Sequence, residues 1–324
     1  MSVLRRQFLK LTLGAAALPS FAPFAAAEGY PERPIHLIIG FTPGAATDLI
    51  GRLFAQSAAP LLGQQFVVEN KPGAGSSIAA QYVARAQSDG YTLFVPALST
   101  LTNEIANPST LDMSRDFAPV ALLADGTFVL AVNPGLKVNS VSALIELAKA
   151  KPGQLLYGTV GAGSLPHLCA EMFAQRAGLK LTHVPYPGSP QVVTDLVAGR
   201  IAMTFNVAST LLGQLAAGEL LALAVASKTR SGALPNVPTM AEAGMPDFVA
   251  SLWIGLLAPA GTPRPVVEKL AAAAHKAMHA PDTVATLHKQ AYEPLDAGPD
   301  QFAAFIKSET ERWSEVARAA GQPG

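Results

Sequence analysis

The stretch IHLIIGFTPGAATDLIGRLF, residues 35–54, decides the fold class of this chain. Its first part is a run of β-branched and apolar residues and predicts a strand over residues 35–41. After a turn that contains Pro43 and Gly44, apolar residues recur at helical spacing and predict a helix. A strand that passes through a short turn into a helix is the unit from which largely parallel α/β sheets are built.

The same unit recurs along the rest of the 324-residue chain, a length that fits about two typical domains. We therefore predict an α/β protein with two sheet units rather than one. Further strands are expected at residues 66–69, 91–96, 128–132, 155–160, 181–184, 201–205, 220–226 and 253–257. Helices are expected at residues 78–86 and 141–149, from residues 165 and 191 onward, and in two C-terminal segments that start near residues 262 and 299.

The composition excludes several classes of partner and cofactor. Lys and Arg number 23 against 23 Asp and Glu, so the chain offers no electrostatic footprint for nucleic acid or an anionic membrane surface. Half of the residues are hydrophobic, which is enough for a sizeable core. The single cysteine, Cys169, excludes an internal disulfide and a cysteine-based metal cluster, and its apolar helical surroundings predict an ordinary core residue.

The N-terminus has the three parts of an export signal. The basic motif RRQFLK (residues 5–10) precedes an apolar run over residues 11–17 and a small-residue segment that ends at Ala27. The paired arginines resemble a twin-arginine signal, which exports folded cargo. A membrane anchor is the alternative, but Pro19 and Pro23 interrupt the run, which is shorter than the roughly 20 residues that span a bilayer. We expect cleavage after Ala27 and a soluble mature protein in the periplasm.

The turn after the first predicted strand is the most informative candidate site. Unpaired backbone N–H groups and the positive end of a helix dipole point out of such a turn, and small residues let an anion approach them. Thr47 can add a hydroxyl hydrogen bond, so a carboxylate fits well; the alternative is a plain strand-to-helix connection. This first loop comprises Phe41, Thr42, Pro43, Gly44, Ala45, Ala46, Thr47 and Asp48.

A second turn of the same kind lies in the second predicted sheet unit, and two such turns in different lobes suggest opposing jaws around one ligand. This second loop comprises Gly161, Ala162, Gly163 and Ser164. His167, in the helix that follows, is either a packing residue at the helix start or a ligand donor. Two further turns, at residues 71–77 and at Pro187, Gly188 and Ser189, either line the cleft or only turn the chain.

No pattern typical of an enzyme is present in the sequence. No serine has the Gly-x-Ser-x-Gly spacing of a hydrolase, and neither loop completes a dinucleotide fingerprint or a phosphate loop. His275 and His279 stand one helical turn apart, but the acidic partner of the His-Glu-x-x-His zinc motif is absent, which favours a solvated helix face. We therefore predict no catalytic residue, no metal and no cofactor.

Several short segments, in their order along the chain, resemble the extracytoplasmic receptors of tripartite tricarboxylate transporters, often called Bug receptors. The resemblance covers Tyr30 to Gly321, and its specificity comes from the order, because each segment alone is weak. The segments are YPERPI (30–35), FTPG with TD (41–44 and 47–48), VENKPGAG (68–75), DGYTL (89–93), DFAPV (116–120), AKAKPG (148–153), HVPY (183–186), LPNVPT (234–239) and GLLAPAGTP (255–263).

The resemblance implies a two-lobed periplasmic-binding-protein (Venus-flytrap) fold with the ligand cleft between the lobes. Lobe 1 then comprises residues 28–125 plus 255–324, and lobe 2 comprises residues 126–254, after a signal peptide at residues 1–27. It also implies a receptor that holds a small organic carboxylate between the first and second loops and delivers it to membrane transporter subunits. By their position, Ser99, Phe205, Asn206 and Trp253 are expected to line the cleft as well.

Departures from the family pattern bear on the ligand. Ala45 and Ala46 replace glycines of the first loop, which narrows the space near its backbone. Asn206 stands where many relatives have an aspartate, so an ammonium-bearing ligand would lose its counter-charge. We therefore favour a dicarboxylate or an aromatic acid as the ligand, bound by a monomer. Two alternatives remain: a receptor that is read by a sensor kinase instead of a transporter, and an exported enzyme.

Overall fold

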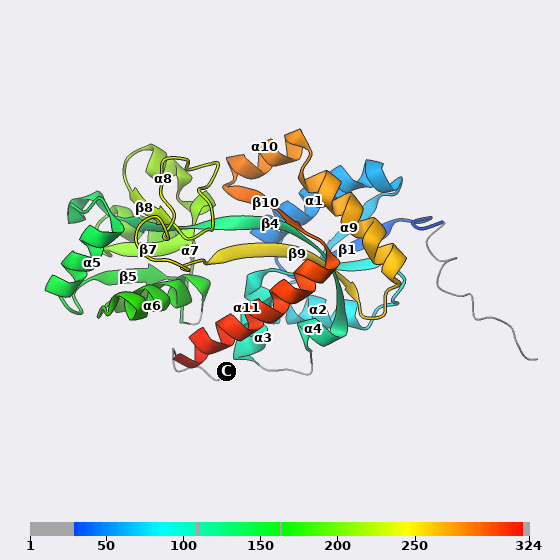
Figure 1. The fold of residues 1–324 in the computed structure, drawn as a ribbon, viewed down its shortest axis with the longest axis horizontal. Helices are drawn as coiled ribbons and strands as arrows, with labels where there is room; N and C mark the ends of the chain where they lie inside the picture. The colour runs from blue at the N-terminus through cyan, green and yellow to red at the C-terminus, as the bar shows by residue number, and fades with distance from the viewer. Residues whose placement is uncertain (1–28, 108–110, 163, 320–324) are drawn as a thin grey trace, which may run out of the picture.

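The computed structural model describes residues 29–107, 111–162 and 164–319, which form two α/β lobes joined by long strands (Figure 1). The predicted signal peptide and Gly163 lie outside the described residues. No helix in the described ranges has the length and apolar character to cross a membrane. The names lobe 1 and lobe 2 are kept below for the residue ranges given above.

Strands and helices alternate in lobe 1 as the sequence predicts. β1 (Ile35–Ile39) pairs in parallel with β2 (Phe66–Asn70) on one side and with β3 (Thr92–Val95) on the other. β3 pairs antiparallel with β9 (Ser251–Pro259), which brings the chain back from lobe 2. The other elements of lobe 1 are α1 (Ala46–Leu62), η1 (Ala74–Ser76), α2 (Ser77–Ala84), α3 (Leu98–Ala106), α4 (Met113–Asp116), α9 (Arg264–Met278), α10 (Pro281–Lys289), β10 (Tyr292–Ala297) and α11 (Pro299–Ala319).

Lobe 2 has a sheet of its own with the same alternation. β5 (Leu156–Thr159) lies between β6 (Thr182–Pro185) and β7 (Met203–Val207) and is parallel to both. β8 (Leu221–Val225) pairs antiparallel with β4 (Phe117–Val132). The remaining elements are η2 (Pro134–Leu136), α5 (Val141–Ala150), α6 (Leu165–Ala177), α7 (Ser189–Val197), η3 (Ala208–Thr210) and α8 (Leu212–Ala216).

The strand β4, which is 16 residues long, connects the two sheets. Its first part pairs antiparallel with β9, from Phe117 opposite Pro259 to Thr127 opposite Ser251, and its second part pairs with β7 and β8. The strand order is therefore β2-β1-β3-β9-β4-β7-β5-β6, with β8 and β10 also paired to β4. The predicted lobe boundaries, at residues 125/126 and 254/255, lie inside the β4–β9 pair and stay predictions.

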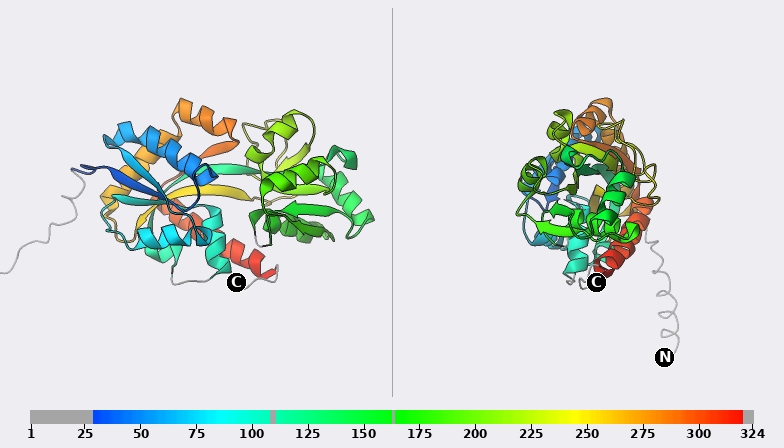
Figure 2. Two further views of the ribbon diagram at one scale, coloured as in Figure 1. Left: turned by 180° about the vertical axis from the view of Figure 1, so that it is seen from behind. Right: turned by 90° about the vertical axis from the view of Figure 1, so that its left-hand side faces the viewer.

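Helices cover both faces of the lobe 1 sheet, and one helix reaches beyond it. α1 and α9 pack together on one face, while α2, α3 and α11 lie on the other (Figures 1 and 2). α11 runs on toward α6 of lobe 2, with Trp313 buried and Arg312 Nη1 donating a hydrogen bond to the carbonyl oxygen of Val249 at 2.6 Å. The C-terminal helix therefore ties the two lobes together.

Candidate ligand-binding cleft

A cavity of about 640 Å³ lies between the two lobes. Its walls come from η1 and α3 in lobe 1, from the ends of β5 and β7 and the starts of α6 and α7 in lobe 2, and from the connecting strands β4 and β9. Among the described lining residues none carries an ionisable side chain, so an anion inside meets no negative charge on these walls. They are Gly75, Ser99, Thr102, Asn103, Ala106, Asn107, Phe128, Val160, Ala162, Ser164, Leu165, Pro166, Ser189, Asn206, Val207 and Leu252.

Two helices of lobe 2 begin at the cavity, and neither N-terminus is capped by a side chain. At α6 the N-cap residue Ser164 donates its hydroxyl to the carbonyl oxygen of Gly161 at 2.6 Å instead of accepting from the helix. At α7 the N-cap residue is Gly188, which has no side chain to offer. Pro166 and Pro190 at the second helical positions have no N–H group, so the amides offered to a ligand are those of Leu165 and Ser189, the first residues of α6 and α7, and the helix dipoles favour negative charge in front of them.

Asn206 supplies the most buried polar side chain of the cavity wall. Only 2% of its surface is exposed, and its Oδ1 accepts a hydrogen bond from the Val207 amide at 2.9 Å. This fixes the orientation of the carboxamide and leaves the Nδ2 group without an acceptor among the described residues. A buried amide donor in an uncharged cavity matches an oxygen acceptor on the ligand.

The first loop is held rigidly, and Asp48 is the centre of the contacts that hold it. Its carboxylate accepts hydrogen bonds from the Gly44 amide at 2.9 Å and from Asn70 Nδ2 at 2.8 Å, and Asn70 also donates to the carbonyl oxygen of Phe41 at 3.0 Å. Burial opposes ionisation of Asp48, but hydrogen bonds from Arg52, Gly44 and Asn70 hold its pKa below the usual range. The role of Asp48 is therefore to position the loop.

Helix α1 starts at the first loop, and its first-turn amides, like those of α6, are not capped by a side chain. Its N-cap residue, Ala45, provides no side-chain acceptor, and the hydroxyl of Thr47 is buried without a hydrogen-bond partner. No residue of the first loop lines the cavity in this conformation. The first loop therefore stays a predicted ligand site.

The first loop connects to the cavity wall through the η1 turn. Gly40 lies against Ser76 so closely that a Cβ atom at Gly40 would be 1.7 Å from Ser76 Oγ. The same turn is fixed to α3, because Asn103 Nδ2 donates to the carbonyl oxygen of Ala74 and to Ser77 Oγ, both at 3.1 Å. Gly40, which leads into the first loop, therefore packs on the turn that carries Gly75, a residue of the cavity wall.

The rings of Tyr157, His167 and His183 pack together next to the second loop. His167 and His183 lie 4.5 Å apart, ring centre to ring centre, and Tyr157 stacks on His183 at 5.1 Å and donates its hydroxyl to Glu171. Thr159 bridges His183 Nε2 at 2.6 Å to the backbone of the second loop. Burial lowers the pKa of both imidazoles and thereby favours their neutral form. His167 packs beneath the loop and does not line the cavity.

The structure brings some of the predicted residues to the cavity and turns others away. Phe205 and Trp253 were expected to line the cavity, but both side chains are fully buried. Phe205 stacks on Phe248, and Trp253 packs on α11. Side chains alternate along a strand, so their neighbours Asn206 and Leu252 line the cavity instead. Of the remaining candidates, Ser99, Ala162, Ser164 and Ser189 line it, whereas Gly161, Pro187 and Gly188 flank it.

The sequence analysis named Ser99 but missed that the polar face of α3 continues along the cavity to Asn103 and Asn107. Ser99, Asn103 and Asn107 are spaced four residues apart and line the cavity, whereas Leu101 and Ile105 of the same helix are buried in the core. A polar stripe at helical spacing opposite an apolar one was the available signal.

Residues 50–322 match the sequence model of a protein family described as the tripartite tricarboxylate transporter family receptor. The chain belongs to this family. This receptor is 37% identical to protein BugT of Bordetella pertussis over 311 residues, 94% of each chain. It is also similar to a solved structure described as a periplasmic transporter, at 40% identity and a TM-score of 0.74 over 89% of this chain and 97% of that chain. An R. palustris protein solved with adipate is 34% identical, with a TM-score of 0.75 over 90% of this chain and 98% of that chain.

These similarities confirm the family resemblance and the periplasmic-binding-protein fold class expected from the sequence. The family is one of receptors rather than enzymes. Elsewhere in the receptor, His275 pairs with Asp296 at 2.9 Å on the surface, and within the described residues no group of His, Cys, Asp and Glu has the arrangement of a metal site. Cys169 is fully buried, and burial raises the pKa of its thiol.

Proposed function

We propose that this receptor captures a small organic carboxylate in the cleft between its lobes, outside the cytoplasm, and delivers it to the membrane subunits of a tripartite transporter. The observation that carries the proposal is the cavity between the lobes, whose described walls are uncharged and which has uncapped helix N-termini and the Asn206 amide at its surface. Amide donors and helix dipoles favour a carboxylate without a charged partner side chain.

Binding is coupled to closure of the lobes. The second loop already lines the cavity, whereas the first loop lies outside it. A ligand that touches the amides of both loops stabilises a closed conformation, because only that conformation offers both sets of contacts. The membrane transporter then recognises the closed receptor.

The ligand is a dicarboxylate or an aromatic acid rather than an amino acid. The described cavity lining contains no carboxylate to pair with an ammonium group, and Asn206 presents a donor where an oxygen acceptor fits. A relative solved with adipate, at 34% identity, supports a dicarboxylate.

The receptor works as an exported monomer without catalytic residues. The RRQFLK motif, the apolar run and the small residues before Ala27 form the export signal, with cleavage after Ala27. The likeness to a periplasmic transporter structure supports the same compartment. Osmotic shock tests the export route. We expect the mature protein in the released periplasmic fraction, and we expect it to be lost from that fraction when both signal arginines are replaced by lysine.

A thermal-shift screen of residues 28–324 tests the binding function. The panel contains monocarboxylates, dicarboxylates from succinate to adipate, tricarboxylates, aromatic acids and amino acids. A ligand at about 100 times its Kd stabilises the folded state by about 2.7 kcal/mol, which raises the Tm by about 5 °C for a protein of this size. We expect at least one acid to do so.

Paired variants localise the binding. Ser164→Leu fills the start of α6 and abolishes the shift, whereas Ser142→Leu, the same exchange at an exposed position of α5, preserves it. If only neutral or cationic compounds raise the Tm, the carboxylate assignment is wrong.

A further inference from the structure

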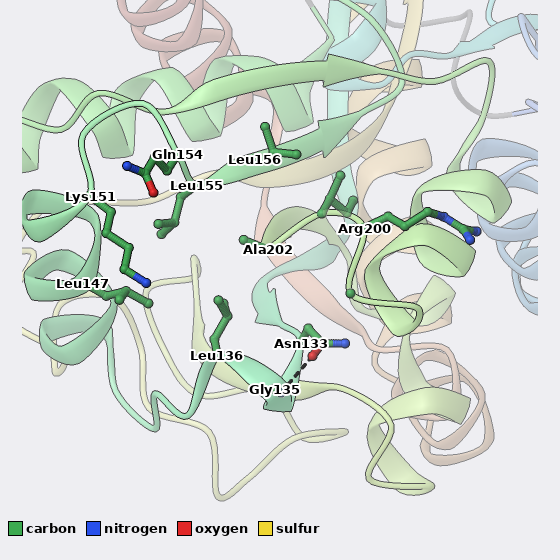
Figure 3. Close-up of a pocket in the computed structure, with 12 residues that line it drawn as sticks. Asn133, Gly135, Leu136, Leu147, Lys151, Gln154, Leu155, Leu156, Arg200 and Ala202 are labelled. Atoms are coloured by element: carbon green, nitrogen blue, oxygen red, sulfur yellow. Dashed lines mark hydrogen bonds between the residues drawn. The ribbon is translucent and has the colours of Figure 1, made fainter.

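A second cavity, of about 430 Å³, lies beside α5 and β5 (Figure 3), elements at the end of lobe 2 that is away from lobe 1 (Figure 1). It is bounded by η2, the C-terminal end of α5, the start of β5 and the turn before β7. Leu156, at the start of β5, lines this cavity, and the cleft residues Val160 and Ala162 follow the other end of the same strand. The length of β5 therefore separates the two cavities.

The second cavity has a wall of mixed polar and apolar surface and one ammonium group without an ion-pair partner. Leu136 and Leu147 supply apolar surface, Leu155 is buried beneath them, and the side chain of Lys151 extends into the space beside Leu147 (Figure 3). Lys151 forms no ion pair with any described residue. Arg200, in contrast, extends away from the cavity and is held by Asp195 at 2.5 Å. The one cation available inside is thus Lys151.

The rim of this cavity is locally basic on a chain that is neutral overall. Lys137 follows Leu136 directly, Lys149 precedes Lys151 by two residues, and Lys180 is brought alongside by a hydrogen bond from the Gly153 amide to its carbonyl oxygen at 2.8 Å. All are exposed, and none is ion-paired within the described ranges. Since the chain has 23 basic and 23 acidic residues, this concentration of positive charge is a local feature.

Lysines at a helix C-terminus interact favourably with the helix dipole. This explains why Lys149 and Lys151 stand at the end of α5. That role needs no hollow with leucine walls beneath the ammonium group. A hollow that holds leucine side chains beside an unpaired cation fits a partner segment that inserts an apolar side chain and pairs a carboxylate at its edge.

We propose that this cavity is the docking socket of lobe 2 for the transporter, and that it receives a segment of a membrane subunit that carries an acidic side chain next to apolar ones. The inference rests on the proposed function, because it requires a transporter partner. The acidic side chain pairs with Lys151, the apolar ones pack on Leu136 and Leu147, and the basic rim attracts the acidic segment on approach. A socket at this end leaves the ligand cleft open for release.

Site-specific photo-cross-linking in cells that produce both receptor and transporter tests the proposal. A benzoylphenylalanine at Gln154, on the cavity wall, is expected to cross-link to an integral membrane transporter subunit, within a peptide that contains Asp or Glu. Lys151→Glu in the same protein lowers the cross-link yield at least fivefold, and Lys151→Gln lowers it less. Lys228→Glu, at an exposed lysine of lobe 2 outside the cavity, leaves it unchanged.

The ligand-induced thermal shift of each variant is measured in parallel. If no carboxylate shifts even the unmodified receptor, the proposed function fails; if the shift is intact in every variant but the cross-link is absent or insensitive to Lys151→Glu, the docking socket is overturned. A cross-link to a soluble protein, or one that forms only from a probe at Gln290 on lobe 1, also overturns it.

Discussion

The Nε–H group of Arg52 is shared between the two carboxylate oxygens of Asp48, at 2.9 and 3.0 Å, one turn into α1. The same guanidinium reaches Asn70 Oδ1 at 2.9 Å through Nη2, so the end of β2, the first loop and the first turn of α1 form one hydrogen-bonded unit. The geometry of the first loop therefore depends on a carboxylate that does not itself touch the cavity.

Asp48→Asn is expected to destabilise the protein by about 2 kcal/mol, because it removes the charge from a buried group that accepts several hydrogen bonds. It should also weaken carboxylate binding, since the first loop loses its fixed shape. Urea denaturation and calorimetric titration measure the two effects. Glu219→Gln, the same exchange of a carboxylate for an amide at an exposed position that makes no ion pair with a described residue, serves as the control and should change neither. Unchanged stability in Asp48→Asn would mean that the loop does not depend on this carboxylate.

Glu104 makes the stability of lobe 1 depend on pH. Burial, which outweighs the hydrogen bond from the Met113 amide, raises its pKa from 4.5 to about 7. A carboxyl group with a raised pKa binds its proton more tightly in the folded state, so its contribution to stability is complete below about pH 4.5 and is lost as the pH rises through 7.

Glu104→Gln should therefore stabilise the protein at pH 8, by about 1 kcal/mol after allowance for partial exposure, and leave its stability unchanged at pH 4. Calorimetric Tm values at the two pH values check this. The exposed Glu146 of α5 provides the control exchange, which should shift neither Tm. A Glu104→Gln effect of equal size at both pH values would contradict the pKa assignment.

Glu293 of β10 joins the lobes at a place outside the cavity. Its carboxylate accepts from the Gly232 amide of lobe 2 at 2.7 Å and pairs with His288 of lobe 1 at 2.9 Å. We infer that closure of the lobes breaks these contacts, which exist in the conformation described here. Removing them lowers the free-energy cost of closure, so Glu293→Ala should raise ligand affinity two- to fivefold in calorimetric titration.

The matched exchange for that experiment is Glu268→Ala, which breaks an exposed ion pair with Arg264 inside lobe 1 and should leave the affinity unchanged. If Glu293→Ala weakens binding, the contact belongs to the closed conformation and the account of closure is wrong.

Asn206 determines the charge preference of the cavity. Asn206→Asp introduces a carboxylate into an otherwise uncharged lining and should weaken binding of a plain dicarboxylate at least tenfold, while an amino acid of the same carbon skeleton loses less or gains. Succinate and aspartate make the comparison in calorimetric titration. Asn139→Asp adds the same charge at an exposed position of lobe 2 and controls for net charge. Equal losses for both ligands would show that Asn206 does not read the ligand.

The local elements of the fold could be predicted from the sequence, whereas long-range pairing could not. The run at residues 35–41 and the helical spacing after it correspond to β1 and α1. The strand β4 was expected only over residues 128–132, because Pro119 and Gly126 interrupt the apolar pattern before it. Its full length depends on pairing with β9, which accommodates Pro119 at a register shift. β10, with Pro294 inside it, was missed for the same reason.

The loops of the candidate site were predictable because strand-to-helix turns have a composition of their own, and the side chains between them were not. Phe205 and Asn206 are neighbours on β7 and face opposite sides of the strand. Phe248 packs on the side of Phe205, so Asn206 faces the cavity. The same holds for Trp253, whose side is decided by the distant helix α11. Such choices are set by tertiary packing, which no local pattern records.

Carboxylate binding between the two loops is tested most directly by a crystal structure of the mature receptor with the carboxylate that gives the largest thermal shift. We expect a closed conformation in which one carboxylate group lies within hydrogen-bonding distance of backbone amides from both the first loop and the second loop, with Asn206 Nδ2 contacting the same ligand. A ligand that contacts one lobe alone, or that occupies the cavity beside Lys151 instead of the cleft, would contradict it.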